Sequence, residues 1–189
     1  MKQDKYYIER VLRGDVNAFS YLVDAHKGMI YTIALRMLKN VEDAEELAQD
    51  TFVKAFSSLK DFKFESKFST WLYRITYNGA ISKLRKKQVE ILDVDEVYLP
   101  ESEVMSSYNA INELNKVEQK KYINEAIGNL KEDDAFIITM YYLRENSIEE
   151  ISEIAGLTLS NVKVKLHRAR KRFYDELKVI LKDEVKAIL

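Results

Sequence analysis

Basic side chains are concentrated in one short stretch near the C-terminal end of the sequence. Six of the ten residues from 163 to 172 are Lys or Arg, and none is acidic. Apolar residues recur every three or four positions through this stretch, so in an α-helix they would form one stripe and leave cations on the other side. They are Val162, Leu166, Ala169 and Phe173. The cationic face could neutralise phosphates, although a single charge cluster is more often a solvated helix surface.

The residues before this stretch favour phosphate binding, because they predict a helix-turn-helix. Ser147 and Glu150 have the spacing of a capping box, which begins a helix by satisfying two free backbone donors. Gly156 can adopt the left-handed conformation that ends a helix, and Thr158 can cap the next one. The second helix of this motif lies against DNA, with short side chains reaching base edges and cations contacting phosphates. The candidate contacts are Ser160, Asn161, Lys163, Val164, His167, Arg168 and Lys171.

A second group of cations follows a loop that contains two phenylalanines. Phe62 and Phe64 alternate with lysines in this loop, and Ser66 is expected to begin a helix from residue 67 to about 87. Rings and cations together could hold unpaired bases by stacking, whereas each ring taken alone is more often part of a core. The candidate contacts here are Phe64, Lys67, Arg74, Asn78, Arg85 and Lys86.

The helix expected after Asn40 carries no concentration of one charge. Asn40 can cap it, and two acidic residues in its first turn suit the positive end of a helix. Its expected core stripe is Ala44, Ala48, Phe52, Ala55, Phe56 and Leu59. A mixed strip projects on another side, formed by Glu46, Gln49, Asp50 and Val53. Periodicity alone makes this strip an ordinary exposed face, with partner binding as the alternative.

The composition predicts an all-α protein of two small domains. The chain has 189 residues, of which 47% are hydrophobic, but only five glycines and one proline, which leaves little turn chemistry for a sheet. Cysteine is absent, and no apolar run approaches the roughly 18 residues of a membrane helix, so we expect a cytoplasmic protein that does not insert into membranes. No nucleophile, metal cluster or phosphate loop is apparent. We therefore expect no catalysis, cofactor or metal.

Charge divides the chain into three parts. Residues 1–88 carry a net charge of +5, residues 89–118 carry −7, and residues 119–189 carry +1. Helical periodicity weakens from 89 to 116, where the single proline lies, and returns in expected helices at 117–130 and 135–143. We therefore predict a domain at 1–88, a flexible acidic linker at 89–116, and a domain at 117–189. The acidic middle should draw the two basic domains together in the free protein.

Four stretches together resemble the extracytoplasmic-function sigma factors, the smallest promoter-recognition subunits of bacterial RNA polymerase. In family order, they are RGD at 13–15 with Ala18 and Phe19, DAEELAQDTF at 43–52, FSTWLYRI at 68–75, and VK at 162–163 with LHRARKR at 166–172.

This resemblance implies roles that the periodicity does not. The helix at 43–59 would dock on the clamp helices of the largest subunit of core RNA polymerase. The loop at 62–68 and the helix after it would open the minus-ten promoter element and hold it single-stranded. The helix-turn-helix would bind duplex DNA at the minus-thirty-five element. The resemblance also implies an anti-sigma factor as a further partner.

Two other classes of function stay open at this point. A conventional helix-turn-helix regulator would use only the C-terminal domain and would bind duplex DNA without polymerase. A helical interaction protein would bind no DNA at all, and its basic helices would be solvated faces. Association with core polymerase separates the sigma factor from both.

Overall fold

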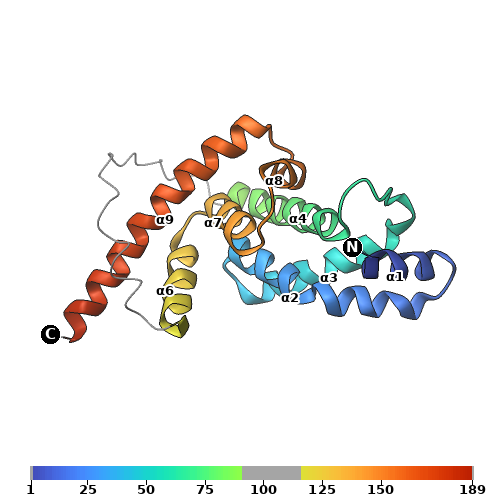
Figure 1. The fold of residues 1–189 in the computed structure, drawn as a ribbon, viewed down its shortest axis with the longest axis horizontal. Coiled ribbons are helices and arrows are strands. Elements are labelled where there is room, and N and C mark those ends of the chain that lie inside the picture. Colours follow the sequence, from blue (N-terminus) through green and yellow to red (C-terminus); the bar gives the residue numbers. More distant parts are fainter. Residues whose placement is uncertain (1, 91–115, 189) are drawn as a thin grey trace.

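The computed structural model describes residues 2–90 and 116–188, and all elements within these ranges are helical, as predicted (Figure 1). The first range contains α1 (Lys2–Leu12), η1 (Val16–Ala18), α2 (Phe19–Leu38), α3 (Val41–Ser57), η2 (Leu59–Asp61) and α4 (Phe68–Glu90). The second contains α6 (Lys116–Asn129), α7 (Glu132–Ile138), the π-helical turn η3 (Thr139–Leu143), α8 (Ile148–Ala155) and α9 (Leu159–Ile188). Most of the expected linker lies outside the described residues.

Helices α2, α3 and α4 pack against one another and form the first bundle. The side chain of Asn40 accepts a hydrogen bond from the Asp43 N–H at 2.8 Å, which caps α3 as predicted. A glycine allows α3 and α4 to approach closely, because a Cβ atom on Gly79 would lie 2.5 Å from Cδ1 of Leu47. Thr51 and Thr76 meet in the same buried contact, with 3.4 Å between their hydroxyl oxygens.

The buried face of α3 is rotated from the one that the sequence predicted. The residues of α3 that are fully buried are Ala44, Leu47, Thr51 and Ala55. The prediction that Phe56 belongs to the core is wrong, since 42% of this residue is exposed. The physical reason is that α3 lies against both α2 and α4, so its buried face points between two neighbours and includes a threonine.

The second bundle consists of α6, α7, α8 and α9, with α6 lying alongside α9 (Figure 1). The expected helix at 135–143 was wrong in extent. Helix α7 begins three residues earlier, at Glu132, and the chain changes to π-helical turns at Thr139. Three acidic residues occupy the first turn of α7, where the helix dipole favours negative charge.

The two bundles are in contact in this structure. Helix α7 packs against α2, and α8 packs against α4. Most buried hydrophobic residues of the two bundles form one continuous cluster that extends from Ile8 to Ala169, and a smaller cluster lies between α6 and α9. The helices expected to read DNA therefore lie on two bundles that share a core.

Candidate functional site

The predicted helix-turn-helix is present in α8 and α9, and each of its expected capping residues acts as predicted. Ser147 Oγ accepts from the Glu150 N–H at 3.2 Å, and the Glu150 carboxylate accepts from the Ser147 N–H at 3.0 Å. Gly156 ends α8 in the left-handed region, with φ of 65°. Thr158 Oγ1 accepts from the Asn161 N–H at 3.2 Å. These bonds fix the start of α9 relative to α8.

Helix α9 presents its apolar stripe inward and the predicted DNA contacts outward. Val162, Leu166 and Ala169 are buried, at 0 to 4% exposure. The predicted contacts that are exposed are Ser160, Asn161, Lys163, Val164, His167 and Arg168, while Lys171 is partly buried. Near the start of the helix, the outward face therefore offers short side chains that could reach base edges, as a recognition helix requires.

Three of the cations between residues 163 and 172 of α9 are held by groups of the same domain. The ammonium of Lys165 lies 2.7 Å from Asp133 of α7. Arg172 pairs with Asp134, whose side chain is nearly buried. The guanidinium of Arg170 lies over the ring of Tyr142, 5.6 Å from its centroid. No local pattern in the sequence predicts these partners, because they lie some 30 residues from the cations. Their effect is to separate structural cations from those that face outward.

The loop between α3 and α4 holds its phenylalanines in two different environments. Phe68 is buried, with 3% exposure, and Phe62 is buried beside it. Phe64 is 42% exposed, and its ring lies 4.9 Å from that of Phe62. The φ of Phe64 is 59°, in a region that aromatic residues rarely adopt. Such strain is found preferentially at functional sites, and here it accompanies an exposed ring.

The predicted contacts on α4 are arranged along its exposed side. Arg74, Asn78, Arg85 and Lys86 are all exposed. Lys67, which precedes α4, lies 2.7 Å from Glu150 at the start of α8. Burial acts to raise the pKa of Glu150, but Lys67, the Ser147 N–H and Asn146 together lower it below its ordinary value. Lys67 thus has a charged partner in the other bundle.

The mixed strip of α3 is exposed in full, and it lies beside an apolar hollow. Glu46, Gln49, Asp50 and Val53 are exposed, and Glu46 pairs with Lys83 at 2.7 Å. Phe56 lies one turn beyond Val53 on the same side of α3.

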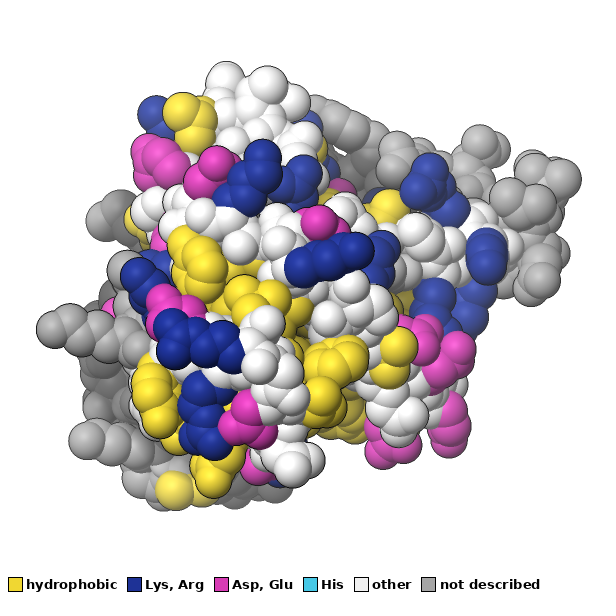
Figure 2. All heavy atoms as spheres, turned by 90° about the vertical axis from the view of Figure 1, so that its right-hand side faces the viewer, with side chains coloured by type: hydrophobic (Ala, Val, Ile, Leu, Met, Phe, Trp, Pro, Cys, Tyr) yellow, Lys and Arg dark blue, Asp and Glu magenta, His cyan; other side chains and the backbone are white. Residues whose placement is uncertain are grey.

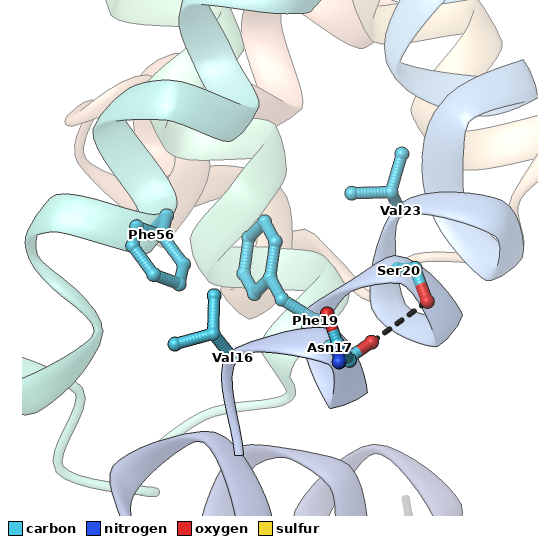
Figure 3. A pocket seen from close by; sticks show the side chains of 6 residues that line it. All are labelled: Val16, Asn17, Phe19, Ser20, Val23 and Phe56. Carbon is cyan, nitrogen blue, oxygen red and sulfur yellow. Dashed lines mark hydrogen bonds between the residues drawn. The ribbon is translucent and has the colours of Figure 1, made fainter. Parts of the chain in front are cut away.

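The hollow beside this strip is open and has a volume of about 610 Å³. The rings of Phe19 and Phe56 meet edge to face in its wall, with centroids 5.0 Å apart (Figure 3). Val16, Asn17, Ser20 and Val23 complete the lining. The hollow was not predicted from the sequence, because Phe56 was expected in the core. The available signal was the spacing of Phe56 three residues after Val53.

The end of the molecule at which α1 lies shows mixed surface chemistry. Figure 2 shows hydrophobic side chains gathered there between scattered basic and acidic ones. Within the described ranges, no cluster of His, Asp or Glu is placed to hold a metal ion. No helix of these ranges is both long enough and apolar enough to cross a membrane.

Comparison with known proteins finds two family models that match separate parts of the chain. Residues 22–90 match Sigma-70 region 2, and residues 120–173 match Sigma-70 region 4. The ECF RNA polymerase sigma factor SigW of Bacillus subtilis is 33% identical over 183 residues, covering 92% of this chain and 96% of SigW. The ECF RNA polymerase sigma-E factor of Escherichia coli K12 is 29% identical, covering 95% of this chain and 96% of that protein.

Solved structures share the fold. The sigma factor RpoE of Bartonella quintana, in complex with the anti-sigma factor NepR, matches with a TM-score of 0.64 and 25% identity, covering 85% of this chain and 97% of RpoE. CnrH, in complex with the cytosolic domain of CnrY, matches in fold with a TM-score of 0.63 and 22% identity, over 96% of this chain and 98% of CnrH. Because the matched regions and the SigW relative agree with the helix-turn-helix seen in α8 and α9, the chain belongs to the extracytoplasmic-function RNA polymerase sigma factors of the sigma-70 family.

Proposed function

We propose that this protein is an alternative sigma factor that binds core RNA polymerase and directs it to specific promoters. The observation that carries the proposal is that one chain presents two different candidate DNA-binding elements on two helical bundles. One is a helix-turn-helix suited to duplex DNA, and the other is an exposed ring beside a cationic helix, suited to unpaired bases. Two moderate contacts made together give selectivity that neither gives alone. Polymerase would perform the chemistry, so we assign the chain no catalytic residue, cofactor or metal.

Residues 117–189 would read the minus-thirty-five element. The exposed start of α9 offers Ser160, Asn161 and Val164 to base edges, where small polar and apolar groups can discriminate between bases. Lys163, His167 and Arg168 are also exposed and would contact the phosphate backbone. Lys171 extends this contact by one turn. Phosphate contacts fix the position of the helix, and base contacts supply the sequence preference.

Residues 1–88 would open and hold the minus-ten element. Unpaired bases need a surface on which to stack and cations for their backbone. Phe64 supplies an exposed ring that rests on Phe62, and Arg74, Asn78, Arg85 and Lys86 supply polar and charged groups along α4. Stacking contributes about 1 to 3 kcal/mol per base, which is comparable with the cost of unstacking a base from duplex DNA. A single exposed ring could therefore shift the balance toward an open promoter.

The exposed strip of α3 would dock on the clamp helices of the polymerase's largest subunit. Its polar part, Glu46, Gln49 and Asp50, could pair with basic and amide side chains of a helix. Val53 and Phe56 are 66% and 42% exposed, and they lead from the polar strip to the apolar hollow. An interface with an apolar centre and a polar rim is the usual arrangement in protein complexes.

We also propose that an anti-sigma factor binds this chain. Two solved structures with the same fold contain a second protein. One is the sigma factor RpoE bound to the anti-sigma factor NepR, and the other is CnrH bound to the cytosolic domain of CnrY. The exposed strip of α3 is a suitable target for such a partner, because covering it would block polymerase.

Run-off transcription with purified core polymerase tests the proposal most directly. A sigma factor should co-elute with core polymerase and should produce discrete transcripts from genomic DNA only when both are present. A helix-turn-helix regulator acting alone would instead shift duplex DNA tightly without polymerase and would not co-elute with it. Absence of both co-elution and transcript initiation would overturn the proposed function.

A further inference from the structure

The N-terminal helix lies beside the loop that carries Phe64. Helix α1 contacts η2, the short turn that leads into this loop, and in Figure 1 the start of α1 lies next to the loop. The ammonium of Lys5 in α1 lies over the Phe64 ring, 5.8 Å from its centroid. A cation within about 6 Å of a ring centroid is attracted by the negative face of the ring. Helix α1 was not among the predicted DNA contacts, yet it places a cation at the exposed ring.

Two contacts hold the segment that carries Lys5. Ile8, one turn further along α1, is buried with 1% exposure. On the other side of Lys5, Asp4 Oδ1 lies 3.2 Å from Nε2 of His26 in α2. The His26 ring in turn meets the ring of Phe68 edge to face, at the start of α4. The backbone of Lys5 is therefore anchored to the same bundle as the aromatic loop, and to the first residue of the helix that follows this loop.

The charge of Lys5 is only weakly held by other groups. Its side chain is 63% exposed, and the carboxylate of Glu9 lies 3.9 Å from its ammonium on the same helix. An exposed pair of this kind contributes little, and the flexible carbon stem of a lysine allows its ammonium to change partners. Lys67, the cation predicted for the loop, lies 2.7 Å from Glu150. Of these two lysines, Lys5 can therefore more readily offer its charge to a phosphate.

A base that stacks on Phe64 would meet the Lys5 ammonium. The ring of Phe62 lies against Phe64 from within the loop, with 4.9 Å between the centroids, and Lys5 lies over Phe64 from α1. Sites for single strands combine rings on which bases stack with cations that follow the backbone. A hydrogen bond between an ammonium and a phosphate is also stronger than one between uncharged groups. The base would therefore replace the ammonium on the ring, and the ammonium would move to the phosphate.

We propose that Lys5 is a phosphate contact of the minus-ten site, which α1 holds over Phe64 until an unpaired base takes its place. The proposal rests on the function proposed above, because it requires that Phe64 holds a base of the non-template strand. Lys5 contacts no base edge in this arrangement, so it strengthens binding without changing the sequence preference. Helix α1 thereby contributes directly to holding the open promoter.

Nuclear magnetic resonance of the free protein tests the contact between Lys5 and Phe64 without polymerase. In protein made with isotope-labelled lysine, the ring current of Phe64 should shift the resonance of the Lys5 Cε methylene. This resonance is identified by its absence in Lys5→Gln. Phe64→Leu should return it toward the position of Lys27, whose side chain is also 63% exposed. A Lys5 resonance that does not move in Phe64→Leu would overturn the placement of the cation over the ring.

The salt dependence of DNA binding tests the phosphate contact. The probe is a single-stranded oligonucleotide with the non-template minus-ten sequence of a promoter found by run-off transcription, bound by the complex of this protein with core polymerase. Each phosphate contact with a single strand contributes about 0.7 to the slope of log affinity against log salt concentration. Lys5→Gln should make the slope shallower by about 0.7, whereas Lys5→Arg should keep it. The control Lys27→Gln removes an equally exposed lysine, which pairs with Asp24 at 2.7 Å, and should leave the slope unchanged.

A third variant, Phe64→Ala, separates this inference from the proposed function. If Phe64→Ala weakens binding of the oligonucleotide but Lys5→Gln leaves the slope unchanged, Lys5 only supports the ring, and this inference alone is wrong. Equal changes of slope in Lys5→Gln and Lys27→Gln would also overturn it, because the charge would then act through the field of the whole domain. If Phe64→Ala binds as tightly as the unmodified protein, base capture at Phe64 is wrong, and this inference fails with it. Circular dichroism checks that each variant stays folded.

Discussion

On α9, Lys165 is paired with an acidic side chain of its own domain, whereas Arg168 faces outward. Substitutions of these two residues should therefore have different effects on DNA binding. Arg168→Ala and Lys165→Ala each remove one positive charge, three residues apart. Arg168 is exposed on the outward face of α9. Lys165 is partly buried, and its ammonium lies 2.7 Å from Asp133 of α7. If position relative to DNA matters, only the first substitution should remove a phosphate contact.

The magnitude follows from counterion release. Each phosphate neutralised by a protein cation contributes about 0.9 to the slope of log affinity against log salt concentration. Arg168→Ala should therefore make the slope shallower by about 0.9. When salt is raised from about 50 to about 200 mM, the affinity of each protein for DNA falls. The fold-decrease for Arg168→Ala should be about 3.5 times smaller than the fold-decrease for the unmodified protein. Lys165→Ala should leave the slope nearly unchanged, and it should cost no more than about 1 kcal/mol of stability, because both side chains of the Lys165–Asp133 pair are only partly buried.

Fluorescence anisotropy with a duplex that carries the minus-thirty-five element, taken from a promoter found by run-off transcription, measures both slopes. Circular dichroism provides the check that each variant stays folded. Equal reductions of the slope in the two variants would mean that charge acts through the field of the whole helix, and the assignment of an outward reading face would be wrong. No reduction in either variant would mean that α9 does not contact phosphates.

Three other predictions address the remaining sites. The double variant Gln49→Ala with Asp50→Arg should weaken co-elution with core polymerase. It should change the free energy of unfolding by less than about 0.5 kcal/mol, because both residues are exposed. The control Lys54→Ala, at another exposed position of α3, should leave co-elution intact. Phe64→Gly should relieve a backbone strain of about 1 to 2 kcal/mol, because the φ of Phe64 is 59°. It should nevertheless reduce promoter opening, measured by permanganate reactivity. A loss of stability together with the loss of opening would show that Phe64 has a structural role instead. The folded pKa of Glu150 lies below 4.5, so its contribution to stability is complete above pH 4.5 and is lost as pH falls through the folded pKa. Urea unfolding should therefore show a smaller loss of stability below pH 4.5 in Glu150→Gln, and an identical loss would contradict this role.

Local signals were sufficient to predict the helix-turn-helix. The capping box of Ser147 and Glu150, the left-handed Gly156 and the cap at Thr158 each depend on residues within four positions of one another. Such signals act through backbone hydrogen bonds that form in the same way in any fold. The apolar stripe of α9 was predictable for a related reason, since the helix packs its stripe against its own domain.

Contacts between distant segments could not be predicted in the same way. On α3, Thr51 replaces an apolar residue in the buried face because its hydroxyl donates to the Leu47 carbonyl at 2.8 Å and meets Thr76 across the α3–α4 contact. A count of apolar residues passes over such a threonine and shifts the predicted stripe toward Phe56. The partners of Lys165 and Arg172 on α7 were hidden for the same reason. The ion pairs of the folded domain therefore decide which cations of α9 can contact DNA.

The three sides of α4 show how one helix can connect the proposed activities. Leu72, Thr76 and Ala80 are buried against the first bundle, and Tyr73 and Tyr77 bind the second. Arg74 and Asn78 face outward. Consecutive residues differ by about 100° around a helix, so these three sides are set by adjacent positions in the sequence. A change in the contact made by Tyr73 or Tyr77 would therefore alter what lies beside Arg74 and Asn78 without altering the core.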